Sequence, residues 1–193
     1  MISANLLEAI AVAFGIISVF LSVRQHIWSW PTALVNVALY FWLFHRVGLY
    51  SDMGLQVVYF ALSLYGWYEW LYGGKGHTTL EVSRATPRIW FGVLAAGVIC
   101  WLVLGAITSR LRGAALPYVD AATTTTSLVA QWMMTRKILE NWTIWIAVDV
   151  VYVGMFIFKH LYLTAGLYAV FLVLAALGHV EWKRSLVAPS AAA

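Results

Sequence analysis

The sequence predicts an all-α integral membrane protein with seven transmembrane helices in a parallel 3+1+3 internal repeat. Of its 193 residues, 63% are hydrophobic and only 10% are charged, whereas about a quarter of the residues of a soluble domain carry charge. Seven apolar segments occupy most of the chain, and the first three resemble the last three. Lipid is therefore the expected solvent, and no separate soluble domain is expected.

Each apolar segment is long enough to cross a bilayer, which takes about 20 residues of helix. In chain order the predicted spans are Ala4–Val23, Trp28–Phe44, Met53–Tyr72, Ile89–Thr108, Leu116–Thr135, Trp142–Phe158 and Leu161–Glu181. The first span is expected to be retained, because no basic residue or small-residue cleavage site marks it as a signal peptide. Tryptophans near span ends are expected in the aromatic belts of the membrane interface: Trp28, Trp30, Trp67, Trp70, Trp90, Trp132 and Trp182.

The fourth span is predicted to be a linker helix, because it contains no charged or amide side chain. Its Cys100 is the single cysteine of the chain. It has no partner for an internal disulfide or a metal site, so we assign it to packing. No metal ligands, cofactor or catalytic group are expected.

Basic residues predict the orientation, since cytoplasmic loops carry the excess of Lys and Arg. Four lie on the side of the N-terminus: Arg46, Arg110, Arg112 and Lys159. Eight lie on the other side: Arg24, Lys75, Arg84, Arg88, Arg136, Lys137, Lys183 and Arg184. The N-terminus is therefore predicted outside and the C-terminus in the cytoplasm. This bias explains the net charge of +4 without a nucleic-acid partner.

The first and last thirds of the chain align with each other, Glu8–Trp70 with Asp120–Trp182, without a gap and with 14 of 63 positions identical. We call this pairing the repeat alignment. The matches include Trp, Tyr, Gly, Arg and Glu, which chance similarity between apolar segments does not explain. We predict four parts: residues 1–72 as the first three-helix repeat, 73–113 as a cytoplasmic loop and linker helix, 114–182 as the second repeat, and 183–193 as a disordered tail. Parallel repeats of this kind are a transporter architecture, with the ligand between the halves.

Asp149 is the sharpest candidate for a binding residue, because a carboxyl group near the middle of a span costs about 2.5–3.5 kcal/mol on insertion scales. Helical spacing places it on one face with Trp142, Trp145 and Tyr152. Two indoles, a phenol and a carboxyl group form a suitable box for a flat, cationic ring. The alternative is that Asp149 bonds to a neighbouring helix as structural glue.

Other polar groups share helical faces in the remaining spans. Span five carries Asp120, Thr124, Ser127 and Gln131, which predicts a wetted wall, and spans two and three contribute Asn36 and Gln56. The hydroxyls are expected to bond between helices. For Asn36, Gln56 and Gln131, a binding role and a structural role are equally favoured. Glu69 and Glu181, equivalent in the repeat, are expected to be interfacial charges.

Other membrane chemistries lack the residues they need. A retinal protein needs a lysine in the middle of its last span, and a haem protein needs paired histidines within spans, but the lysines and histidines of this chain lie at or beyond span ends. Phosphate-binding loops, nucleophile elbows and zinc motifs are absent from the sequence. An enzyme is therefore not expected.

The sequence resembles the Pnu vitamin transporter family. The likeness covers nearly the whole chain and is carried by Trp142-x-x-Trp145-x-x-x-Asp149, preceded by Leu116-Pro117-x-x-Asp120 and Lys137-x-x-Glu140-x-Trp142. It implies facilitated diffusion of an unphosphorylated vitamin or nucleoside through the bacterial inner membrane, trapping by a cytoplasmic kinase, and a homotrimer with one path per protomer.

The resemblance also implies roles within the motif: Trp145 as a stacking residue, and Asp149 where nicotinamide riboside carriers have Asn. An ionised Asp accepts hydrogen bonds but cannot donate them. It therefore suits a nicotinamide riboside pyridinium and equally the aminopyrimidine and thiazolium of thiamine. Nicotinamide riboside is the leading expected substrate, followed by thiamine and then riboflavin. A membrane sensor that binds a vitamin without transporting it is the alternative from another class.

Overall fold

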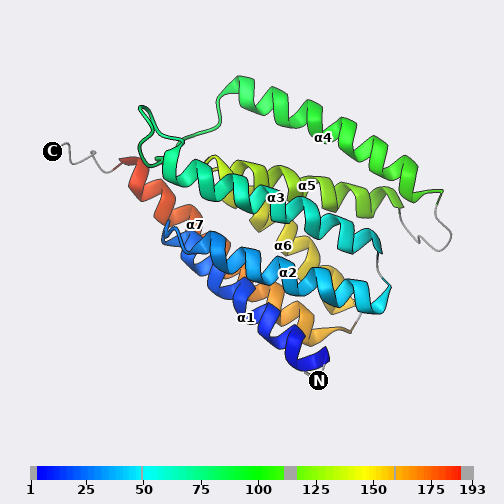
Figure 1. Ribbon diagram of the computed structural model, residues 1–193. Coiled ribbons are helices and arrows are strands. Elements are labelled where there is room, and N and C mark those ends of the chain that lie inside the picture. Colours follow the sequence, from blue (N-terminus) through cyan, green and yellow to red (C-terminus); the bar gives the residue numbers. More distant parts are fainter. Residues whose placement is uncertain (1–3, 49, 111–116, 159, 188–193) are drawn as a thin grey trace.

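The computed structural model describes residues 4–48, 50–110, 117–158 and 160–187. Within these ranges the chain forms seven helices (Figure 1): α1 (Ala4–Val23), α2 (Ser29–Val47), α3 (Tyr50–Tyr72), α4 (Pro87–Thr108), α5 (Pro117–Thr135), α6 (Asn141–Phe158) and α7 (Tyr162–Val187). The seven helices confirm the predicted all-α, seven-helix architecture, whereas the parallel 3+1+3 repeat is not settled by the order of the helices. Of the residues named in the sequence analysis, Arg112, Leu116 and Lys159 lie outside the described ranges.

The predicted tail begins too early. Helix α7 continues past Glu181 through Lys183 and Arg184 to Val187, because no proline or glycine follows Glu181 closely enough to end the helix there. The rest of the predicted tail, residues 188–193, lies outside the described residues.

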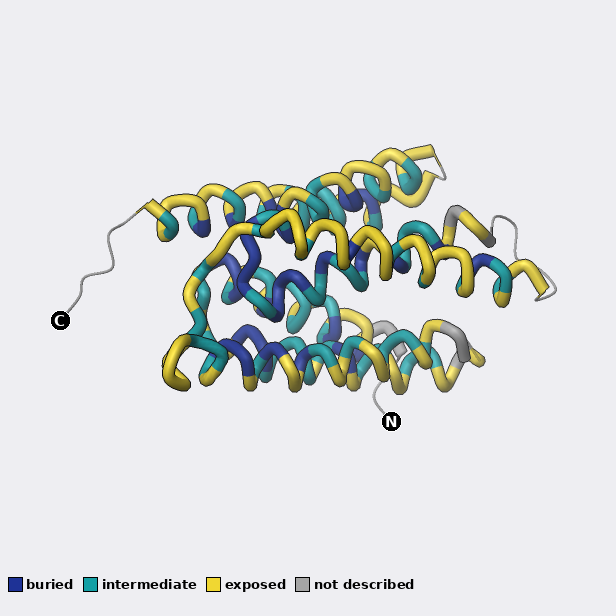
Figure 2. Tube along the Cα trace, turned by 90° about the horizontal axis from the view of Figure 1, so that it is seen from above, coloured by how far each residue is buried: buried dark blue, intermediate teal, exposed yellow. Residues whose placement is uncertain are grey.

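Four helices, α1, α4, α6 and α7, are long and apolar enough to cross a membrane by composition alone. The remaining helices, α2, α3 and α5, have 19, 23 and 19 residues, which is long enough to cross a bilayer. They are less hydrophobic because they carry most of the amide and hydroxyl side chains. Exposed residues follow the outer faces of the helices and buried residues the inner faces (Figure 2).

Six helices form the bundle, and α4 lies outside it. Among the described helices α4 packs only on α5, and Figure 1 shows α4 set apart along the upper edge of the molecule. Within the bundle, α2 lies between α1 and α3, and α6 lies between α5 and α7. The two three-helix units meet along two lines, α1 against α7 and α3 against α5. We call these the α1–α7 seam and the α3–α5 seam.

The repeat alignment exchanges the two seams, because α1 corresponds to α5 and α3 to α7. Two pairs of turns also match in this alignment. Gln25 and Lys137 have left-handed backbones with φ of 53° and 48°, and so do Gly48 and His160 with φ of 75° and 58°. Left-handed residues are common just beyond the end of a helix, where they satisfy its last carbonyls. The repeat stays a prediction, and these paired turns support it.

Four tryptophans form the core at one end of the bundle, which we call the tryptophan end; it is on the left in Figure 1. Trp30, Trp70, Trp142 and Trp182 are at most 3% exposed. Trp30 meets Trp70 edge to face at 5.3 Å and 88°, and Trp142 meets Trp182 at 5.3 Å and 87°. The expected belt position was therefore wrong for Trp30, Trp70 and Trp182. Facing neighbouring helices rather than lipid, they form a packed core.

Glycines make room for this core. A Cβ atom on Gly66 would collide with the Trp30 ring, and one on Gly178 with the Trp142 ring. Gly66 and Gly178 are themselves paired in the repeat alignment. Without a side chain, each lets a neighbouring helix bring an indole against its backbone.

Two of the core tryptophans, Trp70 and Trp182, each form a hydrogen bond across a seam. Trp70 Nε1 donates to the Met134 carbonyl at 3.1 Å, and Trp182 Nε1 donates to the Ser22 carbonyl at 3.0 Å. Met134 and Ser22 are also equivalent in the repeat alignment. Each unit is thus tied to the first helix of the other by the same hydrogen bond.

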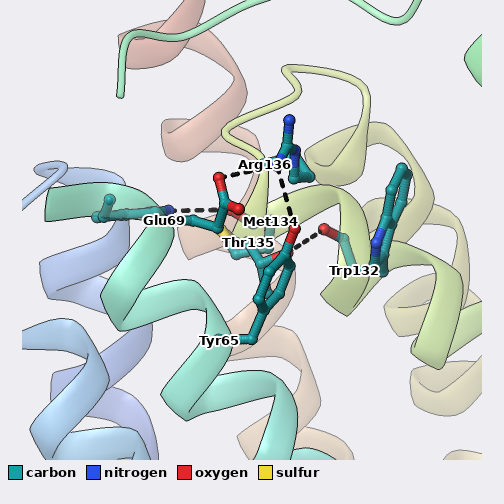
Figure 3. A network of polar contacts seen from close by, with 7 residues as sticks. Tyr65, Glu69, Trp132, Met134, Thr135 and Arg136 are labelled. Atoms are coloured by element: carbon teal, nitrogen blue, oxygen red, sulfur yellow. Dashed lines mark hydrogen bonds and ion pairs between the residues drawn. The ribbon is translucent and has the colours of Figure 1, made fainter. Parts of the chain in front are cut away.

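Glu69 is not an interfacial charge as expected. It is 8% exposed and pairs with Arg136, just beyond the end of α5, at 2.8 Å, while Arg136 also donates to the Tyr65 hydroxyl at 3.1 Å (Figure 3). A carboxylate so far from water needs a charged partner. Arg136 supplies it across the α3–α5 seam.

Candidate substrate cavity

A cavity of about 460 Å³ lies between the two three-helix units. Its walls come from all six helices of the bundle and none from α4. Typical small-molecule sites have volumes of about 300–1,000 Å³. Along each helix the residues that line the cavity are mostly spaced three to four positions apart, because residues at this spacing share one face of a helix.

The cavity brings together six of the nine predicted binding residues. Those that line it are Asn36, Gln56, Gln131, Trp142, Trp145 and Asp149. They come from α2, α3, α5 and α6, so both units contribute. Residues far apart in the sequence meet here because α2, α3, α5 and α6 each turn at least one polar side chain toward the cavity.

Asp149 is 4% exposed, and among the described residues no group forms an ion pair or hydrogen bond with its carboxyl group. The structural-glue alternative requires a bond to a neighbouring helix, and the described residues supply none. A buried carboxyl group without a partner is costly. A ligand in the cavity that donates hydrogen bonds or carries positive charge would relieve this cost.

Trp145 lies one helical turn before Asp149 and is half-buried at the same cavity. This i, i+4 spacing places the ring and the carboxyl group on one face of α6. Trp142, in contrast, is 1% exposed and packed against Trp182 and Gly178. It forms the floor of the cavity at the tryptophan end, and its buried Nε1 has no partner among the described residues.

Asn36 is partly used for packing. Its Nδ2 donates to the Ala11 carbonyl of α1 at 2.7 Å, and a Cβ on Gly15 would lie 3.0 Å from this nitrogen. Asn36 therefore has the structural role expected for it, since its side-chain nitrogen bonds to a neighbouring helix. Because that bond fixes the amide, its oxygen is oriented as an acceptor. For Gln56 and Gln131, the described residues show no such interhelical bond.

Three predicted residues do not line the cavity: Asp120, Thr124 and Tyr152. Asp120 is exposed, and Thr124 is half-buried on the same helix. Tyr152 packs against Tyr168 with ring centroids 4.7 Å apart. Since Tyr168 lines the cavity, Tyr152 supports the wall from behind.

Sequence reasoning missed two aromatic wall residues on α7, Tyr168 and Phe171. They correspond to Gln56 and Tyr59 in the repeat alignment, and both of these also line the cavity. Transferring Gln56 and Tyr59 through the repeat alignment would have pointed to Tyr168 and Phe171. Tyr40 and Ser63 also line the cavity from the first unit.

Among the described residues, no three His, Cys, Asp or Glu side chains are grouped to hold a metal ion. The cavity is instead rich in aromatic rings, amides and hydroxyls around a single carboxyl group. Such walls bind an uncharged or cationic aromatic ligand with hydrogen-bonding substituents.

Comparisons with known proteins agree with this description. Over 204 residues the chain is 25% identical to the nicotinamide riboside transporter PnuC of Escherichia coli (strain K12), covering 93% of this chain and 85% of the relative. It is 28% identical over 190 residues to the nicotinamide riboside transporter PnuC of Neisseria mucosa, covering 92% and 72%. It is 25% identical over 174 residues to the riboflavin/roseoflavin transporter RibM of Streptomyces davaonensis, covering 87% and 80%.

A solved structure has the same fold. The crystal structure of the vitamin B3 transporter PnuC matches with a TM-score of 0.74 at 26% identity, covering 94% of this chain and 82% of that chain. These relatives are transporters, not enzymes. The family model described as nicotinamide mononucleotide transporter matches residues 5–184, which confirms the resemblance seen in the sequence. This chain is a multi-pass membrane protein that belongs to the nicotinamide mononucleotide transporter family.

Proposed function

We propose that this protein takes up nicotinamide riboside by facilitated diffusion across the bacterial inner membrane. The observation that carries the proposal is the unpaired Asp149 carboxyl group, one turn from Trp145 in a central cavity. An indole attracts a flat cation through its ring face, and a carboxylate attracts the same charge and accepts hydrogen bonds. The names of two relatives specify nicotinamide riboside.

Residue roles follow from the cavity walls. Trp145 stacks on the pyridinium ring, and Asp149 accepts from the carboxamide nitrogen or a ribose hydroxyl. Gln56 and Gln131 provide further donors and acceptors, and the Asn36 oxygen accepts. Asp120, Thr124 and Tyr152 are outside the walls and have no direct role in this proposal.

Thiamine is the second candidate, because Asp149 occupies the position where the resemblance implies Asn for nicotinamide riboside carriers. The thiamine aminopyrimidine donates hydrogen bonds and its thiazolium is cationic, so a carboxylate suits both. Riboflavin is third. It is the ligand class named for the Streptomyces relative, but its neutral ring gains less from a carboxylate.

The remaining parts of the proposal concern the cell. We place the tryptophan end at the cytoplasmic side, which the excess of Lys and Arg supports. A cytoplasmic kinase would trap the product, since facilitated diffusion alone cannot concentrate it. A homotrimer with one path per protomer is the proposed assembly, on the basis of the family resemblance.

Uptake into proteoliposomes tests the proposal. Radiolabelled nicotinamide riboside, thiamine and riboflavin are supplied separately, and saturable flux of nicotinamide riboside is expected. Trp145→Ala should abolish it, because the stacking face is lost. Trp90→Ala on α4 is the control and should leave flux unchanged, since Trp90 lies outside the cavity. Ligand binding without flux would instead support a vitamin-binding sensor.

The Asp149→Asn variant tests the choice of substrate. An amide donates as well as accepts, so the ratio of nicotinamide riboside to thiamine affinity should rise in the variant. Competition of each unlabelled vitamin against the other in the same proteoliposomes measures this ratio. An unchanged ratio would show that position 149 does not contact the ring.

A further inference from the structure

The two seams of the bundle are equivalent in the repeat alignment, but their tryptophan ends are held differently. Both have the buried indole-to-carbonyl bond, Trp70 to Met134 in one and Trp182 to Ser22 in the other. The polar contacts that accompany this bond differ between the two seams. The comparison therefore isolates what one seam has and the other lacks.

The α3–α5 seam is closed by charged groups. Glu69 pairs with Arg136 at 2.8 Å, and Arg136 donates to Tyr65 at 3.1 Å (Figure 3). The Lys137 ammonium group lies 4.5 Å from the centre of the Trp70 ring. Hydrogen bonds with a charged partner are about twice as strong as neutral ones, so this seam is firmly held.

The α3–α4 loop strengthens the same closure. Ser83 forms a backbone bridge with the α5–α6 turn, donating to the Lys137 carbonyl and accepting from the Leu139 amide, both at 2.9 Å. Ala85 donates its backbone N–H to Glu140 Oε2 at 2.9 Å. Because this loop leaves the end of α3, it straps α3 to the turn that follows α5.

The α1–α7 seam has none of these charged contacts among the described residues. Its equivalents of Arg136 and Glu69 are Arg24 and Glu181, which do not pair with each other. Glu181 lies 3.8 Å from Arg184 on its own helix. Besides the buried indole bond, the seam has an exposed neutral bond from Gln25 Nε2 to Ser185 Oγ at 3.1 Å.

The cavity wall is also polar on this side. Ser18, Ser22 and Ser29 line the cavity toward the tryptophan end. The equivalents of Ser18 and Ser22 on α5 are the buried Ala130 and Met134. The Ser29 hydroxyl is buried and has no hydrogen-bond partner among the described residues. Hydroxyls in place of methyl and thioether groups lower the cost of wetting this side and of passing a ligand with hydroxyl groups.

We infer that the cavity releases its ligand between α1 and α7 at the tryptophan end, while the α3–α5 seam stays closed and acts as the hinge. The inference rests on the proposed transport function. Separation of α1 from α7 breaks the Trp182–Ser22 and Gln25–Ser185 bonds and exposes the serine-lined wall. Separation at the other seam would break the ion pair and the strap, which is more costly.

Thiol accessibility tests the inference without requiring transport. In a Cys100→Ala background, Ser22→Cys and Met134→Cys provide a matched pair, because both positions line the cavity, both are buried, and each carbonyl accepts one indole bond. A water-soluble methanethiosulfonate should modify Ser22→Cys about tenfold faster or more, since labelling follows local opening. Equal rates, or faster labelling of Met134→Cys, would overturn the assignment.

Cross-linking then connects the opening with flux. Gln25→Cys/Ser185→Cys spans the α1–α7 seam, and Tyr65→Cys/Arg136→Cys spans the α3–α5 seam. A short, reducible bifunctional thiol reagent should stop flux in the first variant, with recovery on reduction, and leave most of it in the second. Blockage of both, of neither or of the second alone would contradict the inference. Absence of flux before cross-linking would count against the proposed function, and the accessibility rates would still decide the route.

Discussion

The two three-helix units share their packing framework but differ where they face the cavity. Trp30 on Gly66 in the first unit is matched by Trp142 on Gly178 in the second. Tyr40 stacks with Phe44 at 5.7 Å, just as Tyr152 stacks with Phe156 at 6.0 Å. The framework is thus built twice from the same contacts.

The cavity walls break this equivalence. Trp145, Asp149 and Gln131 correspond to Ala33, Val37 and Val19, and all six line the cavity. At these three positions the second unit therefore presents aromatic, acidic and amide side chains where the first unit presents small or aliphatic ones. A symmetric scaffold encloses the cavity, whereas asymmetric side chains suit a ligand with two unlike ends.

The shared framework should respond most strongly to mutation. Gly66→Ala and Gly178→Ala should each destabilise the protein, because the new methyl group collides with an indole. Overpacking of this kind costs about 1–3 kcal/mol, and the direct collision with a buried ring places both variants toward the upper end; thermal unfolding in detergent measures the loss. Gly54→Ala and Gly166→Ala are matched controls, also paired in the repeat alignment and with open space around the added Cβ. They should be neutral or slightly stabilising, and equal losses in all four variants would contradict this packing.

A smaller effect separates the two seams. In Arg136→Gln the buried Glu69 carboxylate loses its charged donor, which should cost about 1–2 kcal/mol. Arg24 stands at the equivalent, exposed position, and Arg24→Gln should change stability by less than about 0.5 kcal/mol. Chemical denaturation of the two variants measures the difference. Similar costs would mean that the seams are held equally.

The smallest effect that we expect is a pH dependence of the free energy of unfolding, which arises from Lys137 in the α5–α6 turn. Burial lowers the pKa of Lys137 from 10.5 to about 8, opposed by the nearby Glu81 carboxylate. Between pH 8 and 10.5 Lys137 therefore binds more protons in the unfolded chain than in the folded protein. As a result, the contribution of Lys137 to the free energy of unfolding increases with pH across that window.

Thermal midpoints of the wild type and Lys137→Met across this window test the effect. The wild type should gain stability relative to the variant as pH rises, since the methionine does not titrate. Parallel curves would show that Lys137 is not desolvated by the turn. Gln25, its equivalent in the first unit, provides no titrating group for comparison, so the effect belongs to the second unit.

The fold was largely predictable because span length and composition are local properties. The predicted first span and the observed α1 have the same bounds, Ala4–Val23. The positions of the tryptophans were not predictable in this way. Trp28 is 61% exposed and Trp30 is 2% exposed, although both stand at the start of one span, because helix rotation depends on packing partners.

The site was partly predictable for the same reason. A carboxyl group in the middle of a span requires an explanation wherever the helices pack, so Asp149 could be found from the sequence alone. Asp120 is also an acidic residue on a polar stripe, yet it is exposed away from the cavity walls. Its position depends on how far the cavity extends along α5, which only the assembled bundle determines.

At cavity positions where the second unit is polar and its first-unit equivalent is apolar, the second-unit side chain should contribute more to ligand binding. Calorimetric titration of nicotinamide riboside tests this with Asp149→Val and Val37→Ala, two substitutions at equivalent cavity positions. Loss of a charged hydrogen bond predicts at least about tenfold weaker binding for Asp149→Val, and less than about threefold for Val37→Ala. Equal losses, or a larger loss at Val37, would contradict this assignment of the binding wall.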